Sequence, residues 1–256
     1  TGGGYDRVAR IMAKYLPKYI PGKPAVIVEN MDGAGTMIAA NYVYNVSKPD
    51  GLTLGIFDRG LPFAQLAKLE GVKFDVMKYG WIGSMAAEST IMAIRNDLPY
   101  KTIQDMQKVK DPIYLCNSGA VTMEGQFSLF VREFLKVNIK FIIYPSNAEG
   151  MLAVERKEAM GRSGSYSSLK PYIERGLVHP VVRGRVSEPG IEDLPVNEDL
   201  TNDKLAKTLM AMLAAPDRVG RPFVVPPKTP KEPVEILRKA FAEAAKDSEL
   251  QAEAKQ

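Results

Sequence analysis

The chain has 256 residues, of which 45% are hydrophobic and 25% are charged, and these proportions are typical of globular domains. Its 34 basic and 30 acidic residues are interspersed, and no apolar run approaches the ~18 residues of a membrane span, so we expect neither a nucleic-acid partner nor a membrane-spanning helix. One cysteine, Cys116, and one histidine, His179, exclude a disulfide framework, and we expect no metal site and no cofactor.

The first third of the sequence alternates helical and extended patterns. In order, we predict a helix at 5–19, a buried strand at 24–31, a helix through Met37 and Tyr42, a strand at 53–58, an irregular stretch at 60–80, and extended chain at 81–96 that is divided by a polar break. Alternating strands and helices predict a doubly wound α/β lobe.

The alternation resumes in the second part of the chain. We predict helices at 102–109, 122–136, 148–159, 167–176 and 204–214, strands at 113–118, 139–145 and 178–182, and loops over much of 176–203. Five prolines make 221–233 a stiff extended connection before a closing amphipathic helix. This order predicts two lobes, with 1–95 and 221–256 in the first and 96–220 in the second.

Two glycine-rich turns precede predicted helices. Amides of the Gly2 to Asp6 turn would lie at a helix N-terminus and could bind a carboxylate or phosphate, although for this turn alone a simple turn with Asp6 as N-cap is the favoured interpretation. Such turns usually follow a strand, so we expect one upstream of Thr1. The second turn, DGAG at 32–35, lacks the third small residue of a dinucleotide-binding fingerprint, because Ile38 stands there.

Two polar turns in the second half also join a strand to a helix. They are CNSGAVT at 116–122 and YPSNAEG at 144–150, and each is also compatible with an ordinary helix cap. In an open α/β sheet, ligands bind outside the carboxyl ends of the strands, where these turns must lie. Polar turns at equivalent ends of both halves would face one another across a cleft.

Arg59 and Arg162 are the candidate cations for a carboxylate ligand, because a guanidinium can bind a carboxylate through two parallel hydrogen bonds. Each is also compatible with a solvated surface arginine. A hydrolase or transferase that uses Ser163 or Ser165 is the alternative function. GRSGS at 161–165 resembles a nucleophile elbow but ends in serine, and only His179 could complete a triad.

Several motifs together carry a family resemblance. TGGGYDRVARIMAKYLP, PGKPAVIVENMDGAG and AANYVYNVSKPDGLTLG occur in the order and at the spacing typical of Bug-type substrate-binding proteins of the tripartite tricarboxylate transporter family. WIGS, NSGAVT, YPSNAEG and PPKTPKEPVEILRKAF extend the similarity over nearly the whole chain.

The resemblance implies a two-domain periplasmic-binding-protein fold of the Venus-flytrap type, without catalytic residues, whose lobes close around a small organic carboxylate. It implies a monomeric periplasmic protein that delivers its ligand to integral-membrane permease subunits. The ligand-binding residues expected from the motifs and the resemblance together are Gly3, Gly4, Tyr5, Asp6, Asp58, Arg59, Ser118, Gly119, Ala120, Thr122, Ser146, Asn147, Ala148, Arg162 and Ser165.

The sequence departs from the family pattern at a few positions. Asp32 stands where proline is common, and a Lys-Gly pair is usual near Asn147. Small or hydroxyl residues are usual near Asp58 and Arg59. We therefore expect Arg59 or Arg162 to favour a second carboxylate group on the ligand.

Overall fold

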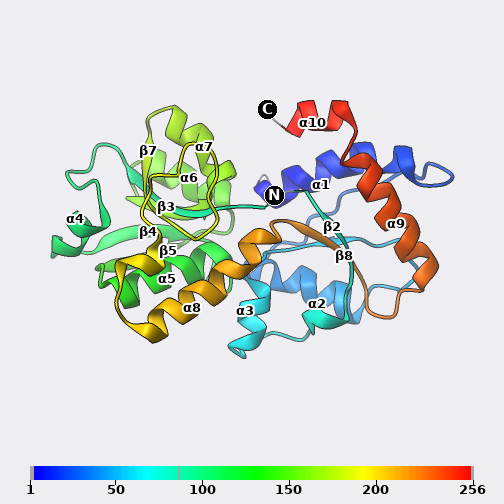
Figure 1. The fold of residues 1–256 in the computed structure, drawn as a ribbon, viewed down its shortest axis with the longest axis horizontal. Coiled ribbons are helices and arrows are strands. Elements are labelled where there is room, and N and C mark those ends of the chain that lie inside the picture. The colour runs from blue at the N-terminus through cyan, green and yellow to red at the C-terminus, as the bar shows by residue number, and fades with distance from the viewer. Residues whose placement is uncertain (1–2, 86, 255–256) are drawn as a thin grey trace. The chain divides into compact units, whose positions relative to one another are not determined.

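The computed structural model describes residues 3–85 and 87–254, which form two compact units. The first unit comprises Thr1–Ala86 and Gly220–Gln256, and the second comprises Ala87–Val219. Each unit contains one β-sheet covered by helices, which confirms the predicted α/β fold class (Figure 1). Residues 87–95, assigned to the first lobe from the sequence, lie in the second unit because the strand they contain is paired on both sides there.

The first unit has a three-stranded sheet. Its strands are β1 (Gly55–Ile56), β8 (Pro222–Val225) and β2 (Gly80–Ser84), with β8 in the centre and antiparallel to both neighbours. Its helices are α1 (Gly4–Tyr15), α2 (Met37–Asn45), α3 (Leu61–Leu66), α9 (Lys231–Ala244) and α10 (Ser248–Ala254), with 3-10 turns at Leu16–Tyr19, Ala34–Thr36 and Val76–Lys78. Met12 of α1 and Phe241 of α9 share one core with β8, so opposite ends of the sequence build this unit together (Figure 1).

The predicted strand at 24–31 is wrong. No strand within the described part of the chain pairs with these residues, and Ile27 is 82% exposed. Apolar β-branched residues favour extended chain, but a strand also needs a neighbour that accepts and donates its backbone hydrogen bonds. The stretch at 60–80 was predicted to be irregular, but it contains the short helix α3. Pro62 stands in the first turn of this helix, where its missing N–H is tolerated.

The second unit has a five-stranded sheet in the order β5-β4-β6-β3-β7. Its strands are β3 (Thr90–Arg95), β4 (Ile113–Asn117), β5 (Ile139–Ile143), β6 (Gly161–Ser165) and β7 (Val178–Arg183). Its helices are α4 (Ile103–Lys108), α5 (Met123–Leu135), α6 (Asn147–Glu155), α7 (Tyr166–Glu174) and α8 (Lys204–Ala214), with 3-10 turns at Asn197–Leu200 and Ala215–Arg218. β4 is parallel to β5 and β6, whereas β3 is antiparallel to β6 and β7.

Two strands were not predicted from the sequence. β6 consists of glycine, serine and arginine, residues with little β-propensity, yet all five are buried. A Cβ atom on Gly161 would collide with the carbonyl group of Ala93 on β3, so the close approach of two backbones selects glycine there. β8 lies within the proline-rich segment, and Pro222 occupies its first position, where a missing N–H is tolerated.

Candidate functional site

The polar turns of the second unit follow two neighbouring parallel strands. β4 and β5 are in register from Ile113 opposite Ile139 to Asn117 opposite Ile143. The amide of Tyr144 donates to the carbonyl of Asn117 at 3.0 Å, so the turns at 118–122 and 144–146 begin side by side. Because β6 runs parallel to β4, its carboxyl end at Ser165 lies at the same edge of the sheet. This edge is where an open α/β sheet binds ligands.

The turn before α5 is held tightly by Thr122. Its Oγ accepts a hydrogen bond from the amide of Gly125 at 3.1 Å and donates one to the carbonyl of Gly119 at 2.8 Å. Gly119 has a φ of 137°, and a Cβ on Gly125 would collide with the Gly119 carbonyl oxygen. The turn therefore depends on both glycines, and the Thr122 hydroxyl caps the helix.

The serine hydroxyls of both turns donate to protein carboxylates. Ser118 Oγ donates to Glu124 Oε1 at 3.1 Å, and Ser146 Oγ donates to Glu149 Oε1 at 3.0 Å. An ionised carboxylate only accepts hydrogen bonds, so these hydroxyl protons point at the protein. The amides of Asn147 and Ala148, at the start of α6, have no acceptor in the described part of the chain. Backbone amides are therefore among the donors that this edge offers to an anion.

Arg162 is the second residue of β6, and its side chain reaches the turns at this edge. Its side chain is 4% exposed and contacts both Asn147 and Glu124. A Cβ on Gly150 would come within 3.1 Å of Cys116 Sγ and 3.7 Å of Arg162 Nη1, so the first turn of α6 packs directly on these side chains. The Cys116 thiol is buried there, which raises its pKa.

The side chains required by the hydrolase alternative are far apart. Ser165 pairs with Thr90 at one end of β3, and His179 pairs with Ile94 near the other end on the opposite side of that strand. At ~3.3 Å per residue and ~4.8 Å per strand, the separation exceeds hydrogen-bond reach several-fold. His179 instead contacts Asn96 at 2.8 Å, and fully buried Ser163 accepts from Ser128 at 2.7 Å. These residues form no nucleophile and base pair.

The turns of the first unit also adjoin one another. Tyr5 Oη accepts a hydrogen bond from the amide of Arg59 at 2.9 Å, which joins the first turn to the one after β1. The amide of Asp58 donates to Thr36 Oγ1 at 2.8 Å, which brings the 32–36 turn to the same place. Asp58 Oδ1 accepts from the amide of Gly60 at 2.7 Å, and both Asp58 and Arg59 are buried.

Asp6 connects the first helix to the segment that follows it. α1 begins at Gly4 after the N-cap residue Gly3, so Asp6 lies in the first helical turn and does not cap the helix; Gly2 lies outside the described residues. Asp6 Oδ1 accepts from Asn30 at 2.8 Å and pairs with Arg10 at 3.0 Å. The contact with Asn30 ties the first turn of α1 to the segment PGKPAVIVENMDGAG.

Arg221 belongs to this cluster, although no sequence motif indicated it. Its guanidinium carbon lies 5.7 Å from the centroid of the Tyr5 ring, within cation–π range. Tyr5 is half-buried, and removal of its hydroxyl group from water, together with the nearby Asp58 carboxylate, raises its pKa. Arg221 directly precedes β8, so its position follows from a strand that the sequence did not reveal.

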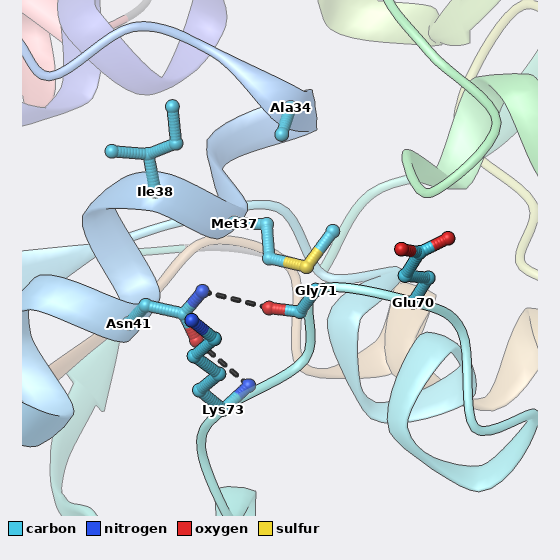
Figure 2. Close-up of a pocket in the computed structure, with 7 residues that line it drawn as sticks. All are labelled: Ala34, Met37, Ile38, Asn41, Glu70, Gly71 and Lys73. Atoms are coloured by element: carbon cyan, nitrogen blue, oxygen red, sulfur yellow. Dashed lines mark hydrogen bonds between the residues drawn. The ribbon is translucent and has the colours of Figure 1, made fainter.

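A hollow of about 370 Å³ lies elsewhere in the first unit, between α2 and the 70–73 segment. Figure 2 shows the Asn41 side chain at this hollow, where it donates to the Gly71 carbonyl at 2.8 Å and accepts from the Lys73 amide at 2.9 Å. The lining residues are Ala34, Met37, Ile38, Asn41, Glu70, Gly71 and Lys73, none of which was predicted to bind ligand. Ala34 belongs to the 32–35 turn, so the hollow adjoins that turn, but none of the residues expected to bind ligand lines it.

Two features are absent from residues 3–85 and 87–254. No three His, Cys, Asp or Glu side chains lie close enough together there to hold a metal ion. No helix in those ranges has both the length and the apolar character needed to cross a membrane.

Comparison with solved structures shows the fold. The chain is similar over its full length to the periplasmic binding protein BugD, with 24% identity, 83% coverage of that chain and a TM-score of 0.80. It is similar over 99% of its length to MatC from Rhodopseudomonas palustris with bound malate, with 21% identity, 84% coverage and a TM-score of 0.80. A third protein, from R. palustris and solved with adipate, covers 94% of the chain at 19% identity, with 79% of its own length matched and a TM-score of 0.71.

Comparison with curated proteins gives no match. The model of the tripartite tricarboxylate transporter family receptor matches residues 8–253, nearly the whole chain. This match confirms the resemblance found in the motifs, and members of the family are substrate-binding receptors, not enzymes. The chain belongs to the tripartite tricarboxylate transporter receptor family of periplasmic binding proteins.

Proposed function

We propose that this chain is an extracytoplasmic receptor that captures a small organic carboxylate and delivers it, chemically unchanged, to integral-membrane permease subunits. The observation that carries the proposal is the sheet edge of the second unit, where two parallel strands end side by side in turns that start α5 and α6. Amides at the start of α6 have no protein acceptor in the described chain, and a helix N-terminus favours an anion.

The turns of the first unit supply the second set of contacts in this proposal. Gly3, Gly4 and Tyr5 adjoin Arg59 through the Tyr5 hydroxyl group, and Arg221 adds a second buried cation nearby. Ligand contacts from both units favour an arrangement in which the units are closed on the ligand. The malate and adipate bound by two proteins of similar fold have two carboxylate groups each, which supports a dicarboxylate as the first class to test.

A thermal-shift screen tests the proposal. The panel contains malate, succinate, adipate, citrate, acetate and benzoate, each at millimolar concentration. A carboxylate present at 100 times its Kd stabilises the folded chain by about 2.7 kcal/mol, so a binder raises the melting temperature by several degrees. Chromatography of the ligand after incubation should recover it unchanged. Absence of any shift across the panel, or conversion of the ligand to a product, contradicts the proposal.

A further inference from the structure

The guanidinium group of Arg162 is almost fully engaged by the protein. Of its five N–H groups, four have acceptors. Nε donates to the Ser163 carbonyl at 2.9 Å, and Nη1 donates to the Asn147 carbonyl at 2.9 Å. Nη2 donates to Asn147 Oδ1 at 2.6 Å and contacts Glu124 Oε1 at 3.5 Å. A guanidinium held in this way has no pair of parallel donors left for a ligand carboxylate.

The contact between Arg162 and Asn147 fixes the orientation of the Asn147 side-chain amide. Only the amide oxygen can accept from a guanidinium, so Oδ1 must face Arg162. Nδ2 is then directed away from Arg162, and it has no acceptor among the residues that the structure describes. Asn147 is the first residue of α6 and half-buried, so its side-chain NH₂ group lies next to the amides of Asn147 and Ala148.

The same guanidinium group compensates the charge of Glu124. This carboxylate lies in the first turn of α5, is 10% exposed and accepts from Ser118. Without a cation beside it, its charge would oppose an anion at the neighbouring turn. Arg162 therefore acts on both turns, by hydrogen bonds to the 146–150 segment and by charge on the 118–124 segment.

We propose that Arg162 is a positioning residue and that the Asn147 side-chain NH₂ group is the specificity-determining donor it presents to the ligand carboxylate. The inference rests on the proposed function, because it assumes that the carboxylate binds at the start of α6. Arg162 was expected from the sequence to contact the ligand. In this proposal it is instead a buried residue that holds Asn147 in place. Asn147 can donate to the ligand only when its amide oxygen faces Arg162, because its NH₂ group is then directed away from the guanidinium.

The substitution Asn147→Asp separates this role from folding. The introduced carboxylate keeps an oxygen for Arg162 to bind, so the urea midpoint should equal or exceed that of the wild type. It offers the ligand no donor and places a negative charge beside it, so affinity should fall about tenfold or more. Asn202→Asp, an exposed substitution of the same charge in the same unit, is the matched control and should leave affinity within about twofold.

A double-mutant cycle tests the positioning role of Arg162. Arg162→Lys keeps the positive charge but cannot make the same set of bonds from a single ammonium group. Its effect on affinity should be large in the wild-type chain and small in the Asn147→Asp chain, because the amide group that Arg162 orients is then absent. A merely structural role would reduce affinity equally in both chains.

Titration calorimetry with malate and adipate as the probes, together with urea unfolding of each variant, gives the decisive readouts. Loss of affinity in Asn147→Asp without loss of stability, and coupling in the cycle, support the inference. Wild-type binding that Asn147→Asp leaves unchanged overturns it while the proposed function stands. A wild-type chain that binds neither probe nor any other carboxylate of the panel overturns the proposed function, and the inference with it.

Discussion

One contact in each unit joins neighbouring candidate turns, and the two contacts differ in their chemistry. In the second unit, a buried guanidinium links the turns before α5 and α6 through charged and neutral acceptors. In the first unit, the Tyr5 hydroxyl group accepts one backbone hydrogen bond from Arg59 to join the corresponding turns. The comparison teaches that polar side chains near such turns bond to the protein itself, through a charged group in one unit and a neutral group in the other. It also predicts that loss of the Arg162 contacts lowers the free energy of unfolding far more than loss of the Tyr5 hydrogen bond.

The largest effect is expected from Arg162→Met. Removal of the guanidinium leaves Glu124 and the Asn147 carbonyl buried without their charged partner, and a broken buried ion pair typically destabilises a protein by about 3–5 kcal/mol. The free energy of unfolding, measured by circular dichroism in urea, should fall by that amount. Arg156→Met, an exposed arginine on the same unit, should change it by about 0.5 kcal/mol or less. Equal effects of the two substitutions would contradict the role of Arg162.

Gly125→Ala should have the next largest effect. Its Cβ would collide with the backbone of Gly119, which cannot rotate away as a flexible side chain can, so the turn must shift at a cost of about 1–3 kcal/mol. Gly150→Ala provides the comparison, because its Cβ would approach the side chain of Cys116 at 3.1 Å, where a small adjustment suffices. The melting temperature of Gly125→Ala should therefore be lower than that of Gly150→Ala. The reverse order would be inconsistent with a rigid turn before α5.

Tyr5→Phe tests the neutral link of the first unit. It removes the acceptor of the Arg59 amide but keeps the ring, so we expect a loss of about 1 kcal/mol in the free energy of unfolding. Urea unfolding under the conditions used for Arg162→Met gives the direct comparison between the units. A loss as large as that of Arg162→Met would show that the two links are energetically equivalent.

The last expected effect, which is absent at neutral pH, concerns the pH dependence of stability at Cys116. Burial raises the pKa of this thiol in the folded chain, so ionisation favours the unfolded chain. The neutral thiol contributes its full share of the folding stability below the pKa of about 8.5 that a cysteine has in the unfolded chain. As the pH rises above that value, this stability is lost by at most about 1.4 kcal/mol per pH unit. The stability of wild type relative to Cys116→Ala should decline between about pH 8.5 and pH 10. A difference that stays constant over this range would contradict a buried thiol.

Hydrophobic spacing predicted most of the helices and the sheet of the second unit. The predicted helix at 204–214 has the bounds of α8, and the predicted strand at 113–118 agrees with β4 to one residue. These elements depend on local patterns that the sequence displays directly. β6 was not predicted because its Gly161 is required by the close approach of the β3 backbone, which the sequence does not display. The segment 24–31 was wrongly predicted as a strand because composition cannot show whether a strand has a partner.

The sequence indicated the candidate turns but not their contacts. Glycines and hydroxyl residues after strands marked these segments, and in the second unit the structure brings two of them side by side. The partners of those residues depend on tertiary structure, since Arg162 and Asn147 are 15 positions apart and Tyr5 and Arg59 are 54 apart. For the same reason, no motif indicated the engagement of Ser118 by Glu124 or the approach of Arg221 to Tyr5.

Amide chemical-shift mapping of the ¹⁵N-labelled chain, with malate and adipate as ligands, tests most directly whether a carboxylate binds at the candidate turns. The largest shifts are expected at the amides of Asn147 and Ala148 and at the Asn147 side-chain NH₂ group, with further shifts at 118–120 and at Gly4 and Tyr5. Shifts confined to the hollow around Asn41 and Lys73, with the 146–148 amides unmoved, would contradict a site built on these turns.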